Sequence, residues 1–493
     1  MKASADATRI YFEEHKSVQH KPLADTGIQI SAAGFGAYRI DNSSEEYKEA
    51  LRFALKQGVN LIDTSTNYSN GDSEKCIGNV LYDCMSRGVL SREQAVVVSK
   101  AGYIQGDLYE ESQQRKQQGT GFKDLVEYDD GLEHCIHPEF LAEQIGNSLE
   151  RLQLECIDVY LLHNPEYFKY HAQKQGFSPE ETNNAYYARI EEAFEYLEEE
   201  VLAGRIQYYG VSSNTFAYHP THPDATALSK LLDIVQKRAF KHFKVIQCPL
   251  NIFEYQALQQ SDGHSCIELA QEHNIAVLTN RPLNAIVNHR LYRLAEVEDQ
   301  DEIALIEIDD CLEEGSLHEA SLREKFKELE LPDTTLNYFQ IFYLLRDHFN
   351  DDLNYFDFKN MIASSYYPLL TQLIHYMSEQ PFELEVTELF EEYTRNANIA
   401  LRNILNYLAN KQNSKMSDLK HHIYSKCPEL ATCFRFSNLM LRMYRSRQGV
   451  SSVLVGMRSQ EYAKSVVEEL KEPCDQPIDS LWDSVQDFQH VIY

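Results

Sequence analysis

The sequence lacks several features that would assign the protein to a class at once. Its 493 residues include one tryptophan and no run of 18 apolar residues, so no membrane span is predicted. Residues 1–9 contain no apolar signal core. Positive charge is scarce: 46 Lys and Arg stand against 76 Asp and Glu, giving a net charge of −30. This balance argues against partners such as nucleic acid or an anionic membrane, which attract basic surfaces.

Paired metal and thiol ligands are also missing. The ten cysteines are scattered and form no Cys-x-x-Cys motif, which favours a reducing, cytoplasmic location over a disulfide framework or a zinc ribbon. The pairs His219/His222 and His421/His422 have a spacing that metal ligands can use. Neither pair has a third ligand in view, so we predict no metal site.

Three nucleotide-binding and catalytic motifs are absent from the sequence. There is no Gly-x-Ser-x-Gly nucleophile elbow and no Walker loop. The segment Gly34-Phe-Gly36 stops short of the Gly-x-Gly-x-x-Gly that opens a helix in a Rossmann site. The sequence therefore does not support a Rossmann dinucleotide site.

Short aliphatic segments that alternate with helical patterns predict an α/β fold. The predicted strands are 33–36, 59–62, 95–99, 157–162, 207–212, 244–248, 275–279 and 451–455. The clearest helix covers 138–152, where Pro138 suits the first helical position and Leu141 and Ile145 belong to an apolar stripe. Eight strands separated by helices predict a (β/α)8 TIM barrel rather than a doubly wound sheet.

Two segments interrupt this alternation. The polar segment 103–137 is predicted to be a long loop at the rim of the active site. The segment 287–435 opens acidic, then becomes helical and aromatic, and carries enough apolar residues to pack. We expect its aromatic group, Tyr338 to Tyr343, to be buried.

The chain therefore divides into three predicted parts. Residues 1–286 hold barrel strands 1–7, and residues 287–435 form a mostly helical insertion between strands 7 and 8. Residues 436–493 hold the last helix–strand unit of the barrel and a C-terminal tail.

Four polar residues stand at or just beyond the ends of predicted strands: Asp63, Tyr68, Lys100 and His163. In a parallel barrel, side chains at this end converge on one pocket. Reduction of a carbonyl by hydride transfer leaves negative charge on oxygen, so a proton donor is needed. A tyrosine can serve when a neighbouring cation favours its phenolate. Each residue alone could be a cap or a packing residue, but the set predicts an active site.

These motifs resemble the aldo-keto reductase family of NAD(P)H-dependent oxidoreductases. The family's Asp-Thr-Ala-x-x-Tyr is present as Asp63-Thr-Ser-Thr-Asn-Tyr68, with Ser65 in place of the usual Ala. Glu74 and Gly78 match the Glu and Gly that follow it. Segments 25–38, 204–214 and 450–459 resemble the opening hairpin with the first strand, the fifth strand and the eighth strand.

The resemblance implies that the protein reduces a small aldehyde or ketone to an alcohol with NADPH. Tyr68 would donate the proton, Asp63 and Lys100 would tune it, and His163 would donate a hydrogen bond to the carbonyl oxygen. The implied cofactor is NADP, with NAD as the alternative. The implied contacts with the cofactor are Gly36, Ala37, Tyr38, Asp63, Ser212, Ser213, Asn214, Gln247, Asn280, Arg281, Gly456, Met457 and Arg458.

Three of these positions carry open questions. The doubled Ser212-Ser213 leaves open which serine holds the nicotinamide carboxamide. Many family members have a stacking Tyr where Asn280 or Arg281 stands here; Arg281 could stack on the ring or contact a phosphate. Arg458 suits the doubly charged 2′-phosphate of NADP.

Two functions from different classes remain open at this point. The first is an active carbonyl/alcohol oxidoreductase, which the intact set of four residues favours. The second is a catalytically weak, NADP-binding regulatory or scaffold protein that binds a protein partner through its insertion. Because the insertion lies between strands 7 and 8, we expect it on the catalytic face of the barrel, as a lid or a partner surface. The alternative is that it packs outside the barrel, away from the site.

Overall fold

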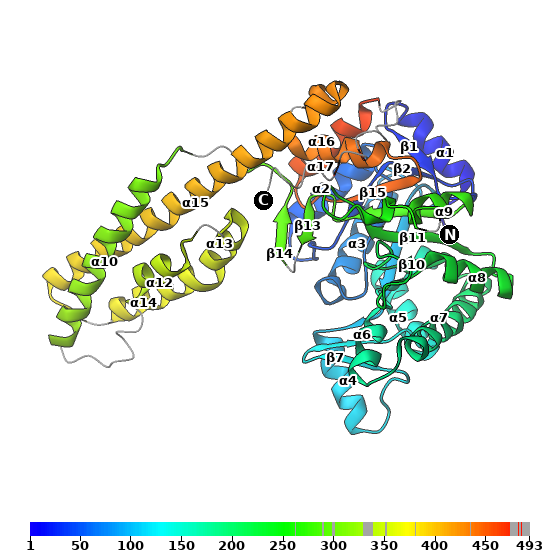
Figure 1. The fold of residues 1–493 in the computed structure, drawn as a ribbon, viewed down its shortest axis with the longest axis horizontal. Helices are drawn as coiled ribbons and strands as arrows, with labels where there is room; N and C mark the ends of the chain where they lie inside the picture. The colour runs from blue at the N-terminus through cyan, green and yellow to red at the C-terminus, as the bar shows by residue number, and fades with distance from the viewer. Residues whose placement is uncertain are drawn as a thin grey trace. The chain divides into compact units, whose positions relative to one another are not determined.

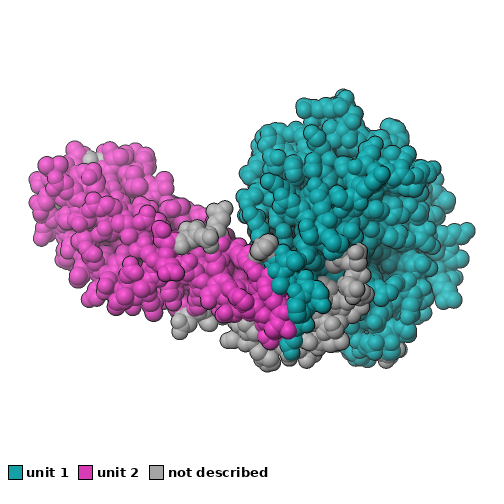
Figure 2. Space-filling model, turned by 90° about the horizontal axis from the view of Figure 1, so that it is seen from above, with its two compact units in different colours: residues 1–294, 426–489 teal, residues 295–425, 490–493 magenta. Residues whose placement is uncertain are grey.

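The computed structural model describes residues 1–261, 263–287, 290–297, 301–328, 339–350, 353–379, 381–433, 435–473, 482 and 485. The chain forms two compact units (Figures 1 and 2). Unit 1 comprises residues 1–294 and 426–489, and unit 2 consists chiefly of residues 295–425. Among the described residues, no helix combines the length and apolarity needed to cross a membrane.

Unit 1 is built on a closed barrel of parallel strands in the order β10-β11-β12-β15-β3-β4-β5-β9. The strands are β3 (Ala33–Gly36), β4 (Leu61–Asp63), β5 (Val96–Ala101), β9 (Ile157–His163), β10 (Ile206–Ser212), β11 (Phe243–Pro249), β12 (Ala276–Asn280) and β15 (Val450–Gly456). This confirms the predicted (β/α)8 barrel and its eight strands. The strands are mostly buried because helices cover their outer face and the barrel core fills their inner face.

Helices surround the barrel (Figure 1). They are α2 (Glu45–Lys56), α3 (Asp72–Ser86), α5 (Pro138–Leu152), α6 (Tyr167–Lys174), α7 (Pro179–Leu202), α8 (Leu228–Arg238), α9 (Cys266–Glu272), α16 (Phe436–Ser446) and α17 (Gln460–Lys471). The helix predicted over 138–152 is confirmed as α5, and Leu141 and Ile145 of its stripe are fully buried. Helix α1 (Ala5–Glu14) and the hairpin of β1 (His20–Pro22) and β2 (Gln29–Ser31) precede the barrel, and a second hairpin, β13 (Asn284–Val287) with β14 (Arg290–Arg293), follows β12.

Two glycines of unit 1 stand where a neighbouring backbone leaves no space for a side chain. A Cβ on Gly210 of β10 would lie 1.7 Å from the Val245 carbonyl oxygen of β11. A Cβ on Gly78 of α3 would lie 2.6 Å from the Arg151 carbonyl oxygen of α5. The glycine that matches the family motif therefore allows close packing of α3 on α5.

The predicted long loop over 103–137 is wrong. This segment contains β6 (Tyr103–Ile104), α4 (Asp107–Gln117), β7 (Val126–Asp129) and β8 (Leu132–His134), with the strands paired in the order β6-β8-β7. The buried Glu133 carboxylate accepts hydrogen bonds from Ser112 Oγ at 2.6 Å and Gln113 Nε2 at 2.8 Å. Polar contacts of this kind order the segment, and a search for apolar periodicity does not detect them.

Unit 2 is helical, as predicted for the insertion. Its helices are α10 (Leu305–Glu328), α12 (Ile341–His348), α13 (Tyr355–Met361), α14 (Tyr367–Glu379) and the long α15 (Leu384–Lys426). All five contribute to one apolar core. The predicted burial of the aromatic group is confirmed for Phe339 and Phe342 and is wrong for Tyr343, which is 68% exposed. Tyr338 lies outside the described residues.

A buried carboxylate joins three helices of unit 2. Glu319 of α10 accepts hydrogen bonds from the backbone N–H of Phe342 at 2.9 Å and of Tyr343 at 3.3 Å. It also accepts a hydrogen bond from the Tyr393 hydroxyl of α15 at 2.9 Å. These bonds satisfy free N–H groups in the first turn of α12, which is the role of a helix cap.

Because α10 and α12 pack closely, adding a methyl group at Gly315 of α10 should destabilise unit 2. A Cβ on Gly315 would lie 1.9 Å from Cε1 of Phe342. Gly315→Ala should therefore destabilise unit 2 by about 1–3 kcal/mol, the usual cost of overpacking, although alanine is the better helix former by about 1 kcal/mol. Hydrogen exchange of the α10 and α12 amides measures this loss.

The matched control is Gly146→Ala in α5, where an added Cβ meets nothing within 4 Å. It should leave the protection of the α5 amides equal or higher. Equal protection of α10 and α12 in Gly315→Ala and the parent protein would contradict the packing argument.

Candidate active site

The structure brings Asp63, Lys100 and His163 together at the carboxyl ends of adjacent strands. Asp63 ends β4, Lys100 is the penultimate residue of β5, and His163 ends β9. Strand β5 pairs with both β4 and β9, so the three side chains lie side by side. Tyr68 opens the short helical turn η1 (Tyr68–Gly71), five residues after Asp63.

The Lys100 ammonium is fully buried and stands at the centre of the cluster. Its Nζ lies 2.8 Å from both carboxylate oxygens of Asp63 and 2.7 Å from the carbonyl oxygen of Thr64. Its Nζ also lies 3.4 Å from the Tyr68 hydroxyl. Burial lowers the pKa of Lys100, and the charge of Asp63 opposes that shift.

The Tyr68 phenol is held in its protonated form. Desolvation is the largest cause that raises its pKa well above the ordinary value, and the charge of Asp63 adds to it, while Arg281 acts in the opposite direction. The Lys100 ammonium lies over the ring of Tyr68, 4.9 Å from the ring centroid, where the positive charge is attracted to the electron-rich face of the ring. The ring of Tyr38, 64% exposed, lies 5.1 Å from that of Tyr68 at nearly a right angle.

The His163 imidazole is neutral. Burial is the main cause that lowers its pKa well below the ordinary value, and the Lys100 charge adds to it. Nδ1 of the ring lies 3.0 Å from Ser65 Oγ. The ring of Tyr103 packs edge-on at 4.7 Å between centroids.

Gln247 of β11 links the cluster to the neighbouring strands. Its Nε2 donates to Asp63 Oδ1 at 2.8 Å, and its Oε1 accepts from Ser212 Oγ and Asn280 Nδ2, each at 3.2 Å. Ser213 instead donates to Thr226 Oγ1 at 3.0 Å, in a separate group of hydroxyls. Of the two neighbouring serines, it is thus the Ser212 side chain that contacts the Gln247 side chain, whereas the Ser213 side chain does not.

Asn280 offers a hydrogen-bond acceptor that is still open. Its Oδ1 is buried and has no hydrogen-bond partner among the described residues. A buried acceptor without a partner is costly, about 1–3 kcal/mol. An amide N–H of a bound molecule would satisfy it, so the residues present fit the carboxamide of a nicotinamide.

Arg281 is oriented by two side chains from other loops. Its guanidinium donates to Glu254 Oε1 at 2.5 Å and to Asn214 Oδ1. Its backbone has a positive φ of 56°, which is uncommon for a residue with a side chain. Asn251 Nδ2 donates to the Arg281 carbonyl oxygen at 3.1 Å, which helps to hold this conformation.

The other predicted cofactor residues lie at the ends of β3 and β15 and in the loops that follow these strands. Of the first group, Gly36 is partly exposed and Ala37 is buried; in the second, Gly456 and Arg458 are exposed and Met457 is buried. Strands β3 and β15 are adjacent, and Gly36 pairs with Gly456. The loop after β3 therefore leaves the barrel beside the loop that carries Arg458.

A group of arginines gathers at this edge of the barrel. Burial is the main cause that lowers the pKa of Arg293 of β14, and the positive charges of Arg39 and Arg458 add to it. The three arginines come from chain segments that follow β12, β15 and β3, which are consecutive in the barrel. In a chain of net charge −30, this edge is suited to an anion.

Sequence reasoning missed several polar residues that complete the site. They are Asn67, Tyr103, Glu166 and Glu254, and it noted Ser65 only as a replacement for Ala. Glu166 is 1% exposed, accepts the Asn214 N–H at 2.9 Å, and burial raises its pKa to about 7. Its position after His163-Asn-Pro was the one available signal, because it follows a strand end.

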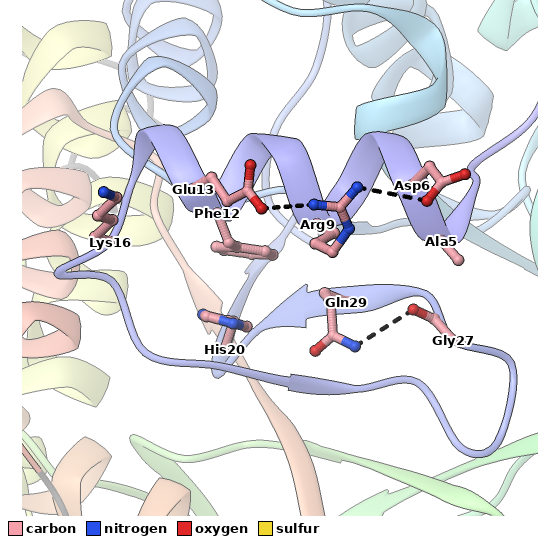
Figure 3. Close-up of a pocket in the computed structure, with 9 residues that line it drawn as sticks. All are labelled: Ala5, Asp6, Arg9, Phe12, Glu13, Lys16, His20, Gly27 and Gln29. Carbon is pink, nitrogen blue, oxygen red and sulfur yellow. Dashed lines mark hydrogen bonds and ion pairs between the residues drawn. The ribbon is translucent and has the colours of Figure 1, made fainter.

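A separate hollow of about 440 Å³ lies between α1 and the β1–β2 hairpin (Figure 3). Its charged groups pair with each other: Arg9 contacts Glu13 at 2.6 Å and Asp6 at 3.6 Å. The backbone N–H of Ala3, just before α1, donates to Asp158 at the start of β9. This hollow is therefore at the opposite end of the barrel from His163 and is not a candidate active site.

The fold and the site define a (β/α)8-barrel protein with a Lys–Asp–Tyr–His cluster at the carboxyl end of its strands. The chain belongs to the Aldo/keto reductase family, a family of oxidoreductases, whose model matches residues 32–302, more than half of the chain.

Curated relatives are distant and match in part. The chain is 24% identical over 245 residues to the aldo-keto reductase YhdN of Bacillus subtilis, covering 48% of this chain and 55% of that protein. It is 25% identical over 264 residues to the NAD(P)H-dependent D-xylose reductase of Scheffersomyces stipitis, covering 51% and 64%. It is 30% identical over 153 residues to the NADH-specific methylglyoxal reductase of Escherichia coli, covering 29% and 40%. The chain thus spans about half the length of the curated relatives it matches.

Two solved structures align with the chain over most of its length, at low identity. The aldo-keto reductase AKR11C1 of Bacillus halodurans aligns with a TM-score of 0.45 at 15% identity, covering 96% of each chain. The glycerol dehydrogenase AKR11B4 of Gluconobacter oxydans aligns with a TM-score of 0.48 at 16% identity, covering 97% of this chain and 96% of that one.

Glu166 predicts a pH dependence of stability. Because its pKa of about 7 lies above that of an unfolded glutamate, the native state holds its proton more tightly. This contribution to stability is complete below about pH 4 and is lost as the pH rises through 7, by up to about 3 kcal/mol. The free energy of unfolding of the parent protein should therefore fall between pH 5 and pH 8 by more than that of Glu166→Gln. Urea denaturation at each pH measures both changes.

The exposed Glu180→Gln on α7 serves as the control and should retain the parental pH profile. If Glu166→Gln also kept that profile, the buried carboxyl would not be the titrating group.

Proposed function

We propose that the protein is an NADP-dependent oxidoreductase that interconverts a small aldehyde or ketone and its alcohol. The observation that carries this proposal is the buried contact of Lys100 with both Asp63 and the Tyr68 hydroxyl, next to a neutral His163. This arrangement supplies a protonated phenol beside a fixed cation. It matches the chemical need of a carbonyl that gains negative charge on oxygen.

In this proposal Tyr68 gives its proton to the carbonyl oxygen during reduction. The phenolate that forms is stabilised by the Lys100 ammonium, 3.4 Å from the hydroxyl oxygen. Asp63 holds the ammonium in place and makes its burial tolerable. His163 contacts the same substrate oxygen and orients it. In the direction of alcohol oxidation, Tyr68 takes the proton back.

The chain has residues that fit a nicotinamide dinucleotide, which supplies the hydride when it is bound. Gln247, Ser212 and the open Asn280 acceptor would hold its carboxamide. Arg281 is held by Asn214 and Glu254 beside this position and would border the ring. The loops after β3 and β15 would take its phosphates.

The arginines at those loops support NADP over NAD. Arg458 is exposed, and its charge acts together with that of Arg39 on the partly buried Arg293. A phosphate monoester with two charges gains more from such a cluster than a hydroxyl does. The names of two relatives show that both cofactors occur among them. The D-xylose reductase is NAD(P)H-dependent, the methylglyoxal reductase is NADH-specific, and both act on small carbonyl compounds.

Removing one oxygen from the site tests the proton donor. Tyr68→Phe should lower kcat for NADPH-dependent reduction of small reactive aldehydes by about 100-fold or more, the usual weight of a general acid. Cofactor binding should stay intact because the change removes little volume. Steady-state kinetics and calorimetric titration with NADPH measure the two effects. Tyr82→Phe, at a tyrosine of α3 that is 64% exposed, is the control. Turnover of Tyr68→Phe at the parental rate would show that the acid is assigned wrongly.

Removing one charge tests the choice of cofactor. Arg458→Ala should weaken NADPH binding more than NADH binding, by about 1.5–3 kcal/mol, the strength of a charge-assisted hydrogen bond. Arg87→Ala removes a similar charge from the end of α3, where Arg87 is 68% exposed, and should change neither affinity. An equal loss of both cofactors in Arg458→Ala, or no loss, would remove Arg458 from the 2′-phosphate.

A further inference from the structure

The backbone takes an unusual conformation directly after Tyr68. Ser69 and Asn70 have φ values of 50° and 53°, and Gly71 has a φ of 84°, so three consecutive residues lie in the left-handed region. Glycine adopts this region without cost, but Ser69 and Asn70 carry a Cβ that is crowded there. Such residues persist where surrounding contacts hold them, and they cluster at functional sites.

The Ser69 hydroxyl makes one of the contacts that hold this left-handed turn. Its Oγ donates a hydrogen bond to the carbonyl oxygen of Ile40 at 3.0 Å. Ile40 is buried in the loop after β3, and its N–H donates to the Ala37 carbonyl oxygen at 3.3 Å. The N–H of Ala37 donates in turn to the carbonyl oxygen of Asp63 at 2.9 Å. The hydroxyl bond therefore ties the turn to a loop that is itself bound to the barrel.

The same loop contacts Tyr68 through a second side chain. The ring of Tyr38, two residues before Ile40, packs edge-on against the ring of Tyr68. The Tyr68 hydroxyl lies 3.4 Å from Nζ of Lys100, near the upper limit for a hydrogen bond. A small displacement of the Tyr68 ring would therefore break its contact with the ammonium.

Packing holds the other two residues of the turn. A Cβ added to Gly106 would collide with Oδ1 of Asn70, and a Cβ added to Gly71 would lie 2.8 Å from Cδ of Arg151. Arg151 is bound to the buried Glu74 at 2.7 Å. The end of the turn is thus held by α5 and by the segment before α4, whereas its start, next to Tyr68, is bound to the loop after β3.

We propose that Ser69 is a positioning residue for the proton donor: its left-handed backbone and its bond to Ile40 hold the Tyr68 hydroxyl within reach of Lys100. The backbone strain at Ser69 sets the direction in which the chain leaves Tyr68. A residue that relaxes this strain should make the protein more stable and the reaction slower. The effect on turnover rests on the proposed function, whereas the position of the Tyr68 ring does not.

Two substitutions at position 69 separate backbone strain from the position of Tyr68. Ser69→Ala removes the hydroxyl and keeps the crowded Cβ, whereas Ser69→Gly removes both. Ser69→Gly should therefore unfold at a higher urea concentration than Ser69→Ala. Both variants should lower kcat for the reduction of benzaldehyde with NADPH about three- to tenfold, the weight of one hydrogen bond. The loss in Ser69→Gly should be at least as large as that in Ser69→Ala.

A role in folding alone would make kcat follow stability. Turnover of Ser69→Gly at the parental rate would therefore overturn the proposal. Ala239→Gly is the matched control, because Ala239 has a φ of 55° at the end of α8, before the start of β11. This change relieves the same kind of strain and should keep the parental kcat. Equal losses of kcat in Ala239→Gly and Ser69→Gly would overturn the role of Ser69.

The position of the Tyr68 ring can also be measured without turnover. In the full-length protein, 3-fluorotyrosine placed at position 68 alone gives a ¹⁹F signal that reports on the surroundings of this ring. In Ser69→Ala and Ser69→Gly the signal should shift and broaden, because the ring loses a fixed position. A signal that stays parental in both variants would overturn the proposal. If neither the parent protein nor any variant reduced an aldehyde, the proposed function would fail, while the ¹⁹F signal would still decide the role of Ser69.

Discussion

The site depends on one buried charge, the Lys100 ammonium. A lysine at 0% exposure is tolerated because Asp63 and the Thr64 carbonyl oxygen surround it at hydrogen-bond distance. The barrel favours this arrangement, since Asp63 and Lys100 lie at the carboxyl ends of adjacent parallel strands, the first as the last residue and the second as the penultimate one. The ion pair then fixes Gln247 on one side and faces the Tyr68 hydroxyl on the other. Losing either charge would leave an uncompensated partner inside the barrel.

Around the ion pair, amide and hydroxyl side chains form hydrogen bonds that extend from the site to neighbouring parts of the barrel. Gln247 accepts hydrogen bonds from Ser212 and Asn280 on the neighbouring strands. Ser65 and Asn67 connect His163 to the rim segment. Hydrogen bonds in such a dry network are strong when complete and costly when one is missing. The open acceptor of Asn280 is thus a natural position for a ligand amide.

Much of the fold followed from sequence because barrel strands leave a clear apolar signal, and the ends of those strands locate Asp63, Lys100 and His163. The rest required three-dimensional contacts. The segment 103–137 folds through Glu133 and its polar partners, which have no apolar period. On α12, Phe342 and Tyr343 are adjacent in sequence, but the first is buried and the second is exposed. The choice between two neighbouring serines, Ser212 and Ser213, needed the Gln247 contact.

The most direct test of the central claim is a crystal structure of the protein with NADP⁺. The account predicts that the nicotinamide carboxamide binds Gln247 and the Asn280 oxygen. The reactive carbon of the ring should then border the same space as the Tyr68 hydroxyl, with room for one substrate oxygen about 3 Å from that hydroxyl. A dinucleotide bound elsewhere, with Lys100, Asp63 and Tyr68 closed off from it, would contradict the account.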